Sequence, residues 1–268
     1  MSDVSLTPYE SWYRNGGLTT YADVFDYNDE KAIEVELIAE HLKGSLQWLK
    51  NEAIATLDIG CGTGRFTVLL LNELCMSFGL GCQSEVDLVD INSGAFDYFR
   101  ETAAKVNTVD IHIRNTFQAP WRLIVLNELE PPYRLIVADH VFYGEPLSPY
   151  LIESLTTLIS PDGVIIVTLQ QANSDVYRMR EPAGIVTNCA EGFRKLLDKT
   201  LIKYEVLDYK SHLYYDPKNN AFREWFFATA TIDIKKQLHL LRKYTYKDKE
   251  GRSYILNRAN IFLIRGGK

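Results

Sequence analysis

The stretch that decides the predicted fold is Leu57-Asp58-Ile59-Gly60-Cys61-Gly62-Thr63-Gly64. It begins in a run of apolar and β-branched residues and ends where the spacing of apolar residues becomes helical. Glycine reaches positive φ without steric cost and lets a ligand come close to the backbone. The stretch therefore predicts a strand, Ile54–Ile59, followed by a glycine-rich turn and a helix, with room for a ligand at the turn.

The segments that follow this turn alternate between strand and helix patterns. Short β-branched runs predict strands, and apolar residues three and four positions apart predict helices. In chain order these segments are helix Thr63–Met76, strand Val86–Ile91, helix Ser93–Val106, strand Val109–Ile113, short helix Trp121–Leu129, strand Tyr133–Ala138, helix Leu147–Ile159 and strand Val164–Leu169. The alternation predicts a parallel sheet that helices cover on both faces.

Both ends of the chain add to this core. The expected additions are a helix within Asp29–Leu49, a helix near Cys189–Leu201, a strand at Lys203–Tyr209, helical periodicity near Arg223–Leu241 and a last strand at Ala259–Arg265. We expect one α/β domain over residues 1–268, with a Rossmann-like, seven-stranded, mostly parallel sheet and a terminal antiparallel hairpin. Its expected parts are an N-terminal helical lid (1–50), a core (51–210), an aromatic insertion (211–257) and the last strand (258–268).

Composition excludes several classes of protein. The 268 residues are 46% hydrophobic and 24% charged, which is typical of a globular chain. A net charge of −6 argues against nucleic-acid binding by a broad basic surface, and no apolar run is long enough to span a membrane. The acidic start is neither a signal nor a transit peptide. Four cysteines without a CxxC pair predict no disulfide framework and no zinc site, so a cytoplasmic location is expected: Cys61, Cys75, Cys82 and Cys189.

An acidic residue, Asp90, ends the second predicted strand about 26 residues after Gly64. A carboxylate at this place can accept hydrogen bonds from both hydroxyls of a ribose. Dinucleotide-binding loops use the spacing G-x-G-x-x-G and hold a pyrophosphate over the helix N-terminus. Here the spacing is G-x-G-x-G, and Asp58, two positions before the first glycine, would repel a pyrophosphate. A nicotinamide-dependent dehydrogenase is therefore the weakest alternative.

This pattern resembles the first motif of the class I S-adenosylmethionine-dependent methyltransferases, which reads E/D-x-G-x-G-x-G. The resemblance implies that the loop backbone meets the methionine part of S-adenosyl-L-methionine, that Asp58 helps hold its amino group and that Asp90 binds the ribose. The cofactor contacts that it implies in this part of the chain are Asp58, Gly60, Cys61, Gly62, Gly64, Asp90 and Ile91. S-adenosyl-L-homocysteine would be the product, and no metal is expected.

The same family places further contacts after its third and fourth strands. The resemblance implies that Thr116 or Gln118 meets the adenine amino group and that Phe117 stacks on the ring. It places the segment 139–144 beneath the transferring methyl group, with Asp139 as a cofactor contact. His140 is a candidate general base there, and a pocket wall or a satisfied polar residue is the alternative reading.

Two motifs of other methyltransferases are missing. Enzymes that act on adenine, cytosine N4 or glutamine amides carry N/D-P-P-Y/F just after the fourth strand. This chain has Pro131-Pro132-Tyr133 at the entry of that strand, where it predicts the end of a helix. The Pro-Cys pair of cytosine C5 enzymes is also absent. Nucleobases are therefore not the expected acceptors.

The layout around the core resembles the histamine N-methyltransferase family. In that family a glutamate at the start of the N-terminal helix, at the position of Glu30, grips the polar end of the substrate, and an asparagine at the start of the last strand assists it. This chain has Asn257-Arg258 near the second position. If Arg258 replaces that asparagine, the acceptor carries an acidic group. Tyr27 and Tyr143 would complete an aromatic box for a cationic acceptor.

The leading hypothesis is therefore methyl transfer to a nitrogen of a small amine, imidazole or indole-like molecule. A natural-product methyltransferase acting on carbon or oxygen is the alternative within the enzyme class. A non-catalytic cofactor-binding subunit is the alternative outside it. The many aromatic residues before the last strand either wrap the core or form an aromatic-walled pocket. The pattern leaves the oligomeric state open.

Overall fold

The computed structural model describes residues 8–18, 28–43, 53–78, 82–185, 187–218 and 220–267. Its centre is a sheet with the strand order β3-β2-β1-β4-β5-β8-β6, and a short β7 pairs with β8. The strands are β1 (Ile54–Ile59), β2 (Cys82–Asp90), β3 (Val109–Gln118), β4 (Tyr133–Asp139), β5 (Ile159–Gln170), β6 (Tyr204–Tyr214), β7 (Tyr246–Lys247) and β8 (Ser253–Arg265). The pairs from β3 to β5 are parallel, and β8 is antiparallel to both β5 and β6. The predicted α/β fold is confirmed, and β7 is an addition to it.

The central strands are buried on both faces, which explains their continuous apolar sequences. In β4, Leu135 and Val137 pack into one core cluster, whereas Ile136 and Ala138 pack into another on the opposite face. Successive side chains of a strand point to opposite faces, so this strand contributes to both cores.

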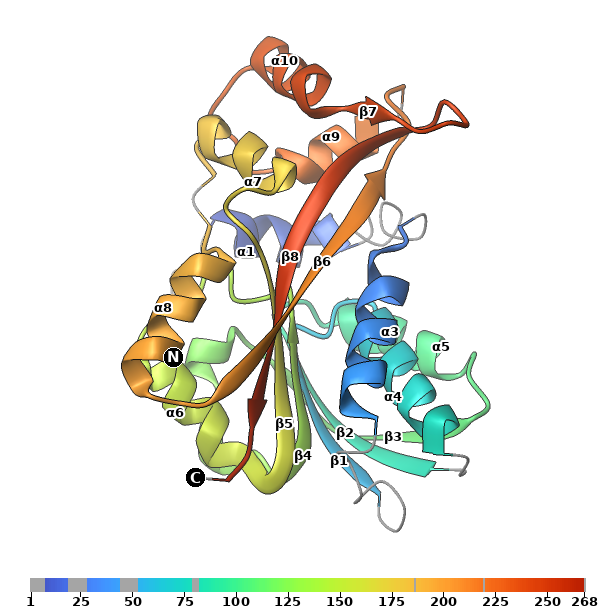
Figure 1. Cartoon of the computed structure of the whole chain (residues 1–268), viewed down its shortest axis with the longest axis vertical. Coiled ribbons are helices and arrows are strands. Elements are labelled where there is room, and N and C mark those ends of the chain that lie inside the picture. The colour runs from blue at the N-terminus through green and yellow to red at the C-terminus, as the bar shows by residue number, and fades with distance from the viewer. Residues whose placement is uncertain are drawn as a thin grey trace.

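Helices cover both faces of the sheet (Figure 1). On one face lie α3 (Glu30–Leu42), α4 (Arg65–Phe78) and α5 (Gly94–Ala103), and on the other lie α6 (Pro149–Leu158) and α8 (Ala190–Thr200). The helix expected within Asp29–Leu49 is α3. Its residues Val35, Ile38 and Leu42 are buried in the core of the first face, so α3 is a sheet-covering helix and not only a lid.

The hairpin of β6 and β8 is longer than predicted and projects beyond the parallel strands (Figure 1). Around the projecting end pack α7 (Asp175–Arg180), α9 (Asn220–Phe226) and α10 (Ile234–Tyr244), which share a third apolar cluster with the hairpin. The expected insertion 211–257 therefore contains strand at both of its ends. The other helical segments are α1 (Pro8–Trp12), η1 (Tyr13–Gly17), η3 (Trp121–Leu123), η4 (Leu126–Glu128) and η5 (Glu181–Ala183).

Further predicted elements differ from the observed ones, since β2 and β5 begin four and five residues earlier than predicted, at Cys82 and Ile159. The short helix expected at Trp121–Leu129 is two single 3₁₀ turns, η3 and η4. Strand β3 continues to Gln118, although the pattern predicted an end at Ile113. Because β3 lies at the edge of the sheet, it accepts exposed polar residues that hide the strand in the sequence.

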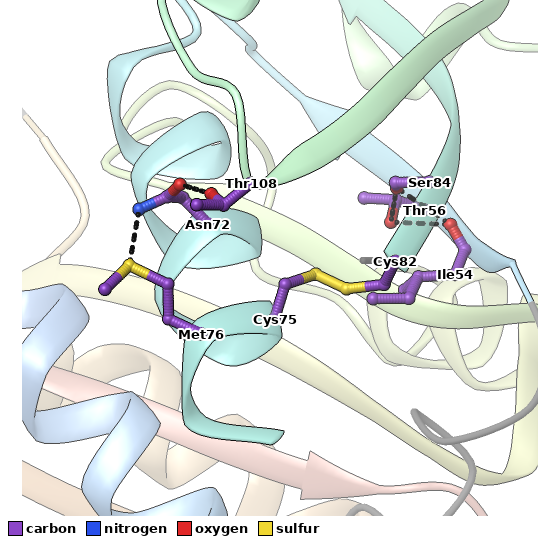
Figure 2. Close-up of a disulfide and its surroundings, with 8 residues drawn as sticks. All are labelled: Ile54, Thr56, Asn72, Cys75, Met76, Cys82, Ser84 and Thr108. Carbon is purple, nitrogen blue, oxygen red and sulfur yellow. Dashed lines mark hydrogen bonds between the residues drawn. A yellow bond between two sulfur atoms is a disulfide. The ribbon is translucent and has the colours of Figure 1, made fainter. Parts of the chain in front are cut away.

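A disulfide joins Cys75, near the end of α4, to Cys82 at the start of β2 (Figure 2). The expectation that the cysteines form no disulfide framework missed this bond, because two cysteines seven positions apart carry no recognisable motif. Cys61 and Cys189 are free thiols. Within the described ranges, the helices are too short or too polar to cross a bilayer.

Candidate functional site

The carboxyl ends of β1, β2 and β4 meet at one edge of the sheet. After β1 the chain builds outward to β2 and β3, and then it returns to place β4 on the other side of β1. Such a reversal of strand order leaves a crevice at the carboxyl ends, where ligands bind in open α/β sheets. A cavity of about 670 Å³ lies there, and Gly60, Asp90 and Asp139 are on its wall. This volume is in the usual range for small-molecule sites.

The glycine loop forms the floor of this cavity. Gly60, Gly62 and Gly64 all have positive φ, at 71°, 51° and 72°. The amides of Gly60 and Cys61 donate to the Val89 carbonyl at 2.7 and 3.2 Å, which ties the loop to the end of β2. A Cβ on Gly60 would collide with the Val141 side chain. The loop therefore needs glycine for its conformation and for the space around it.

Two buried carboxylates flank the loop. One oxygen of Asp58 has no hydrogen-bond partner among the described residues, and burial raises the pKa of Asp58 to about 7. Burial likewise raises the pKa of Asp90 to about 6, although Asp90 accepts hydrogen bonds from the amides of Gly62 at 3.0 Å and Asn92 at 2.8 Å. A cationic or hydroxyl-bearing ligand would relieve the burial of both carboxylates.

A second, smaller cavity of about 30 Å³ lies behind the loop. Its wall includes Asp58 and Lys31, so it offers both an anion and a cation to a ligand. The two cavities share Gly60, Gly62 and Asp139. The small cavity has room for about one water-sized group, so it can receive a charged group at the end of a ligand whose remainder lies in the large cavity.

The next stretch of the cavity wall differs from the sequence prediction. Ile91 lines the cavity as expected, but Thr116, Phe117 and Gln118 are not on its wall. Their places are taken by three residues farther along the chain, Ala119, Pro120 and Trp121. The difference follows from the extra length of β3, which carries Thr116–Gln118 within the strand. Phe117 packs on the second core cluster, and Gln118 donates to the Ile91 carbonyl at 3.5 Å.

The start of α3 is attached to the exposed edge of β6. Asp29 accepts a hydrogen bond from the His212 amide at 3.1 Å, and Asn28 accepts one from the Tyr214 amide at 3.1 Å. Free amides on an edge strand need such partners. This attachment places the first turn of α3, beginning at Glu30, against the cavity.

That first turn brings a cluster of charged side chains into the site. Glu30 and Glu34 are four residues apart and therefore lie on one face of the helix. Lys31 is buried with them, and its Nζ lies 3.0 Å from Glu34 Oε2 and 2.5 Å from Asp139 Oδ2. The other oxygen of Asp139 is buried without a hydrogen-bond partner. The cluster thus joins α3 to the end of β4.

His140 connects this cluster to two tyrosines. Its φ is 53°, in the left-handed region, so the backbone turns sharply after β4. Its Nε2 lies 3.1 Å from Glu34 Oε1 and 3.1 Å from Tyr209 Oη, and its Nδ1 pairs with Tyr143 Oη. Tyr209 also donates to Glu30 at 3.3 Å. All members belong to one hydrogen-bonded network.

Charge in the network is unevenly divided. Burial alone would raise the pKa of Glu30, but the ammonium of Lys31 and the imidazole of His140 bring it down to about 2. Burial and the nearby Asp139 raise the pKa of Glu34. Burial would lower the pKa of His140, but the oxygens of Tyr143, Glu30 and Asp139 outweigh it and raise this pKa well above its ordinary value. Glu30 is therefore ionised, and His140 holds its proton at neutral pH.

Glu30, Glu34 and His140 could also hold a cation, because one ligand atom from each lies within 4.8 Å of the others. Two carboxylates and an imidazole are donors that divalent first-row metals accept. The Lys31 ammonium already lies 3.0 Å from Glu34, however, and it competes with a metal for the same negative charge.

The residues predicted to bind substrate are only partly brought together. Glu30 and Tyr143 line the cavity, and Tyr27 lies outside the described residues. Arg258 is not on the cavity wall, and its backbone amide donates to Ser174 Oγ at 3.1 Å. Neighbouring residues of a strand face opposite sides, so Asn257 enters the cavity instead, and its Nδ2 donates to Glu30. The placement of Arg258 in the site is therefore wrong.

The outer part of the cavity is formed by α7 and α9. Arg180 lies there beside Trp225 and Phe226. The sequence reading gave no role to Lys31, Glu34, Tyr209 or Arg180. The four-residue spacing of Glu30 and Glu34 was a usable signal for Glu34, whereas Arg180 stands in a stretch that reads as polar loop.

Several solved structures share this fold. The plantazolicin methyltransferase BpumL, solved in complex with SAH, is 15% identical, with a TM-score of 0.53 over 97% of this chain and 94% of that one. A putative methyltransferase from Bacillus halodurans is 8% identical, with a TM-score of 0.52 over 85% of this chain and 100% of that one. The YcgJ protein from Bacillus subtilis is 12% identical, with a TM-score of 0.52 over 87% and 98% of the two chains. At such identities the likeness concerns the fold.

Two comparisons rest on sequence. A segment of 118 residues, 44% of this chain, is 25% identical to a highly reducing polyketide synthase, GPY1, of Gibberella fujikuroi, and it spans 4% of that protein's length. The family described as "Methyltransferase domain" matches residues 50–220, which include the glycine loop, Asp90 and the end of β4. Because this match covers more than half of the 268 residues, the chain belongs to the methyltransferase domain family.

Proposed function

We propose that this protein transfers the methyl group of S-adenosyl-L-methionine to a nitrogen of a small-molecule acceptor. The observation that carries the proposal is the pair of cavities that meet at Gly60, Gly62 and Asp139. One cavity suits the amino-acid end of the cofactor, and the other has room for its nucleoside and for an acceptor. Asp139 lies at the junction.

The described residues fit this cofactor. Asp58 offers an unpartnered buried oxygen to the cofactor's ammonium, and Asp90 offers a carboxylate to the ribose hydroxyls. Gly60 and Gly62 line both cavities, so the backbone of the loop faces the ligand. The structure of BpumL with SAH, which has the same fold, supports this assignment. When bound, the cofactor supplies a methyl group on a sulfonium, which is a good leaving group.

The acceptor would bind between Glu30 and Tyr143. The ionised Glu30 attracts a cationic or hydrogen-bond-donating nitrogen, and Asn257 holds the Glu30 carboxylate in place. A glutamate paired with an asparagine of the last strand is what the likeness to histamine N-methyltransferase implies. His140, which keeps its proton, then orients Glu30 and Tyr143 and is a weak candidate for a general base. Positioning does most of the catalysis.

We also propose that the reaction needs no added metal. Lys31 supplies positive charge among Glu34 and Asp139, where a divalent ion would otherwise be required to balance the carboxylates. Treatment with EDTA should leave methyl transfer unchanged, and addition of Mg²⁺ or Mn²⁺ should not raise it. A loss of activity on chelation that Mg²⁺ or Mn²⁺ restores would assign the Glu30, Glu34 and His140 donors to a metal.

Calorimetry with S-adenosylhomocysteine and with NADH tests the cofactor. We expect binding of the former only. Asp90→Ala should weaken that binding by about 1.5–3 kcal/mol, since charge-assisted hydrogen bonds to the ribose are lost. Asp97→Ala, which alters an exposed carboxylate at the start of α5, is the matched control. Unchanged affinity in a folded Asp90→Ala protein would refute the ribose assignment.

A second candidate is methylation of carbon or oxygen in natural-product biosynthesis. The similarity to a segment of a polyketide synthase and the solved complexes of BpumL with desmethylPZN analogs favour it. Screening amines, indoles and phenols with cofactor labelled in its methyl group, followed by NMR of the product, separates the candidates by the atom that carries the label. Strong S-adenosylhomocysteine binding without any transfer would favour a non-catalytic subunit.

A further inference from the structure

Arg180, the last residue of α7, carries a buried positive charge in the outer part of the large cavity. It is 8% exposed and lies on the cavity wall. Its guanidinium carbon is 5.1 Å from the centre of the Phe226 ring, 5.8 Å from that of Trp225 and 6.0 Å from that of Tyr143. Three aromatic rings therefore surround the guanidinium.

The guanidinium has no acceptor for its N–H groups in the part of the chain that the structure describes. Its recorded contacts there are the three rings, and no carboxylate or hydroxyl accepts from it. Contacts with ring faces favour the cation but leave its donors without hydrogen bonds. Burial of a charge without a hydrogen-bonded partner is costly, so this arrangement favours a ligand that brings an acceptor into the cavity.

The two ends of the cavity differ in charge. On the wall formed by described residues, Arg180 is the single lysine or arginine, whereas the inner end carries the carboxylates of Glu30, Asp90 and Asp139 beside the protonated His140. The Tyr143 ring lies between the two ends, since its centre is 5.9 Å from that of His140 and 6.0 Å from the Arg180 guanidinium. A molecule lying along Tyr143 thus meets negative charge at one end and positive charge at the other.

The geometry points to an acceptor that bears a carboxylate, held by Arg180 while its nucleophilic end faces Glu30. This inference rests on the proposed function for the direction in which the acceptor lies. A monoanion balances the positive charge of Arg180, whereas a phosphate dianion would leave excess negative charge among aromatic rings. The planar guanidinium also matches a carboxylate in bidentate fashion. The residue that binds the acidic group of the acceptor, expected to be Arg258, is thus assigned as Arg180 instead.

Binding of matched probes tests the inference without turnover. Indole-3-acetate and 4-hydroxyphenylacetate, and the primary amide of each for comparison, are titrated by calorimetry into the 268-residue protein with and without saturating S-adenosylhomocysteine. Wild-type protein should bind at least one carboxylate tenfold or more tightly than its amide. Arg180→Gln should bring the affinities for the carboxylate and for its amide within twofold of each other, and Arg180→Lys should keep part of the preference for the carboxylate.

Arg178→Gln is the matched control, because Arg178 is on the same helix with a side chain that is 57% exposed. It should keep the wild-type preference. The inference is overturned if wild-type protein prefers no carboxylate, or if Arg180→Gln keeps the preference. If Arg180→Gln does not fold, the carboxylate preference is compared between wild type and Arg180→Lys to test the inference. If S-adenosylhomocysteine does not bind at all, the proposed function fails, whereas the carboxylate preference is still measured without it.

Discussion

The buried carboxylate of Asp58 lowers stability when it is ionised, and the proposed function uses the same carboxylate to bind an ammonium group. Burial raises its pKa to about 7 from an ordinary value of 3.8, so the folded protein holds the Asp58 proton more tightly than the unfolded chain does. The stability that this proton gives is fully present below pH 3.8 and is lost as the pH rises to about 7. The same desolvation makes the ionised carboxylate a strong partner for an ammonium group.

Asp58→Asn should therefore be more stable than wild type at pH 8, by about 4 kcal/mol, and most of the difference should be lost near pH 4. Urea unfolding at several pH values without ligand measures it. Asp97→Asn, with a side chain that is 77% exposed, should show no such pH dependence. A difference between Asp58→Asn and wild type that stays constant from pH 4 to pH 8 would contradict the assignment.

Glu30 gives a second prediction at this scale. Glu30→Gln keeps the shape of the side chain and its hydrogen bond with Asn257 but removes the charge that attracts the acceptor nitrogen. It should raise the acceptor's KM about tenfold or more and leave S-adenosylhomocysteine affinity within about twofold. Glu36→Gln, which changes an exposed residue of the same helix, should alter neither constant. If Glu30→Gln leaves the acceptor's KM unchanged, Glu30 does not bind the acceptor and is only a carboxylate at the start of α3.

The residues that could be predicted are those whose signal is local. Gly60, Gly62 and Asp90 stand in a short strand-turn-helix pattern, and the structure places all of them at the cavity. Arg180 has no such signal, since its burial is created by Trp225 and Phe226, which lie some 45 residues later in the chain. Residues brought together by long-range packing cannot be found from spacing alone.

At the scale of elements, strand length was the main source of error. The apolar strands β1 and β4 were predicted to within one residue, whereas β2 and β5 begin four and five residues earlier than predicted. Edge strand β3 and the hairpin of β6 and β8 continue through polar residues, so residues 119–121 line the cavity where residues 116–118 were expected to. A strand register determines which side chain faces a site, as Asn257 and Arg258 illustrate.

The disulfide between Cys75 and Cys82 gives a prediction at the scale of elements. It closes a short loop between α4 and β2 (Figure 2). In the chain-entropy account, such a loop stabilises the fold by about 2 kcal/mol, so reduction should lower the free energy of unfolding by that amount. Thiol titration of the unfolded protein should find two free cysteines without reductant and four with it. Four free thiols before reduction would contradict the bond.

At the scale of the molecule, the segment 8–18 lies over the large cavity and is held from two sides. Arg122 contacts both oxygens of Glu10, at 2.6 and 2.9 Å, and Asn92 donates to the Tyr13 carbonyl at 2.8 Å. Glu10 and Tyr13 are on the cavity wall. We therefore expect release of a bound ligand to involve the opening of these contacts.

Arg122→Ala should loosen this cover. We expect amide hydrogens in 8–18 to exchange about tenfold faster and S-adenosylhomocysteine to dissociate faster, because a bidentate ion pair is lost. Hydrogen exchange with mass spectrometry and stopped-flow kinetics measure the two effects. Arg134→Ala removes an ion pair with Asp162, 3.1 Å long, at the far end of the sheet and should change neither. Equal exchange rates in Arg122→Ala and wild type would show that Arg122 does not hold the cover.

The long hairpin of β6 and β8 has a consequence for how this enzyme can diversify. Its lower half completes the sheet that carries the glycine loop, whereas the segment between the two strands supplies α9 with Trp225 and Phe226 to the outer cavity. On the proposed function, this segment contributes to the wall around the outer end of the acceptor, whereas Glu30, Tyr143 and Arg180 lie outside it. Exchange of the segment between β6 and β8 would therefore change the outer part of the acceptor site and leave the glycine loop unchanged.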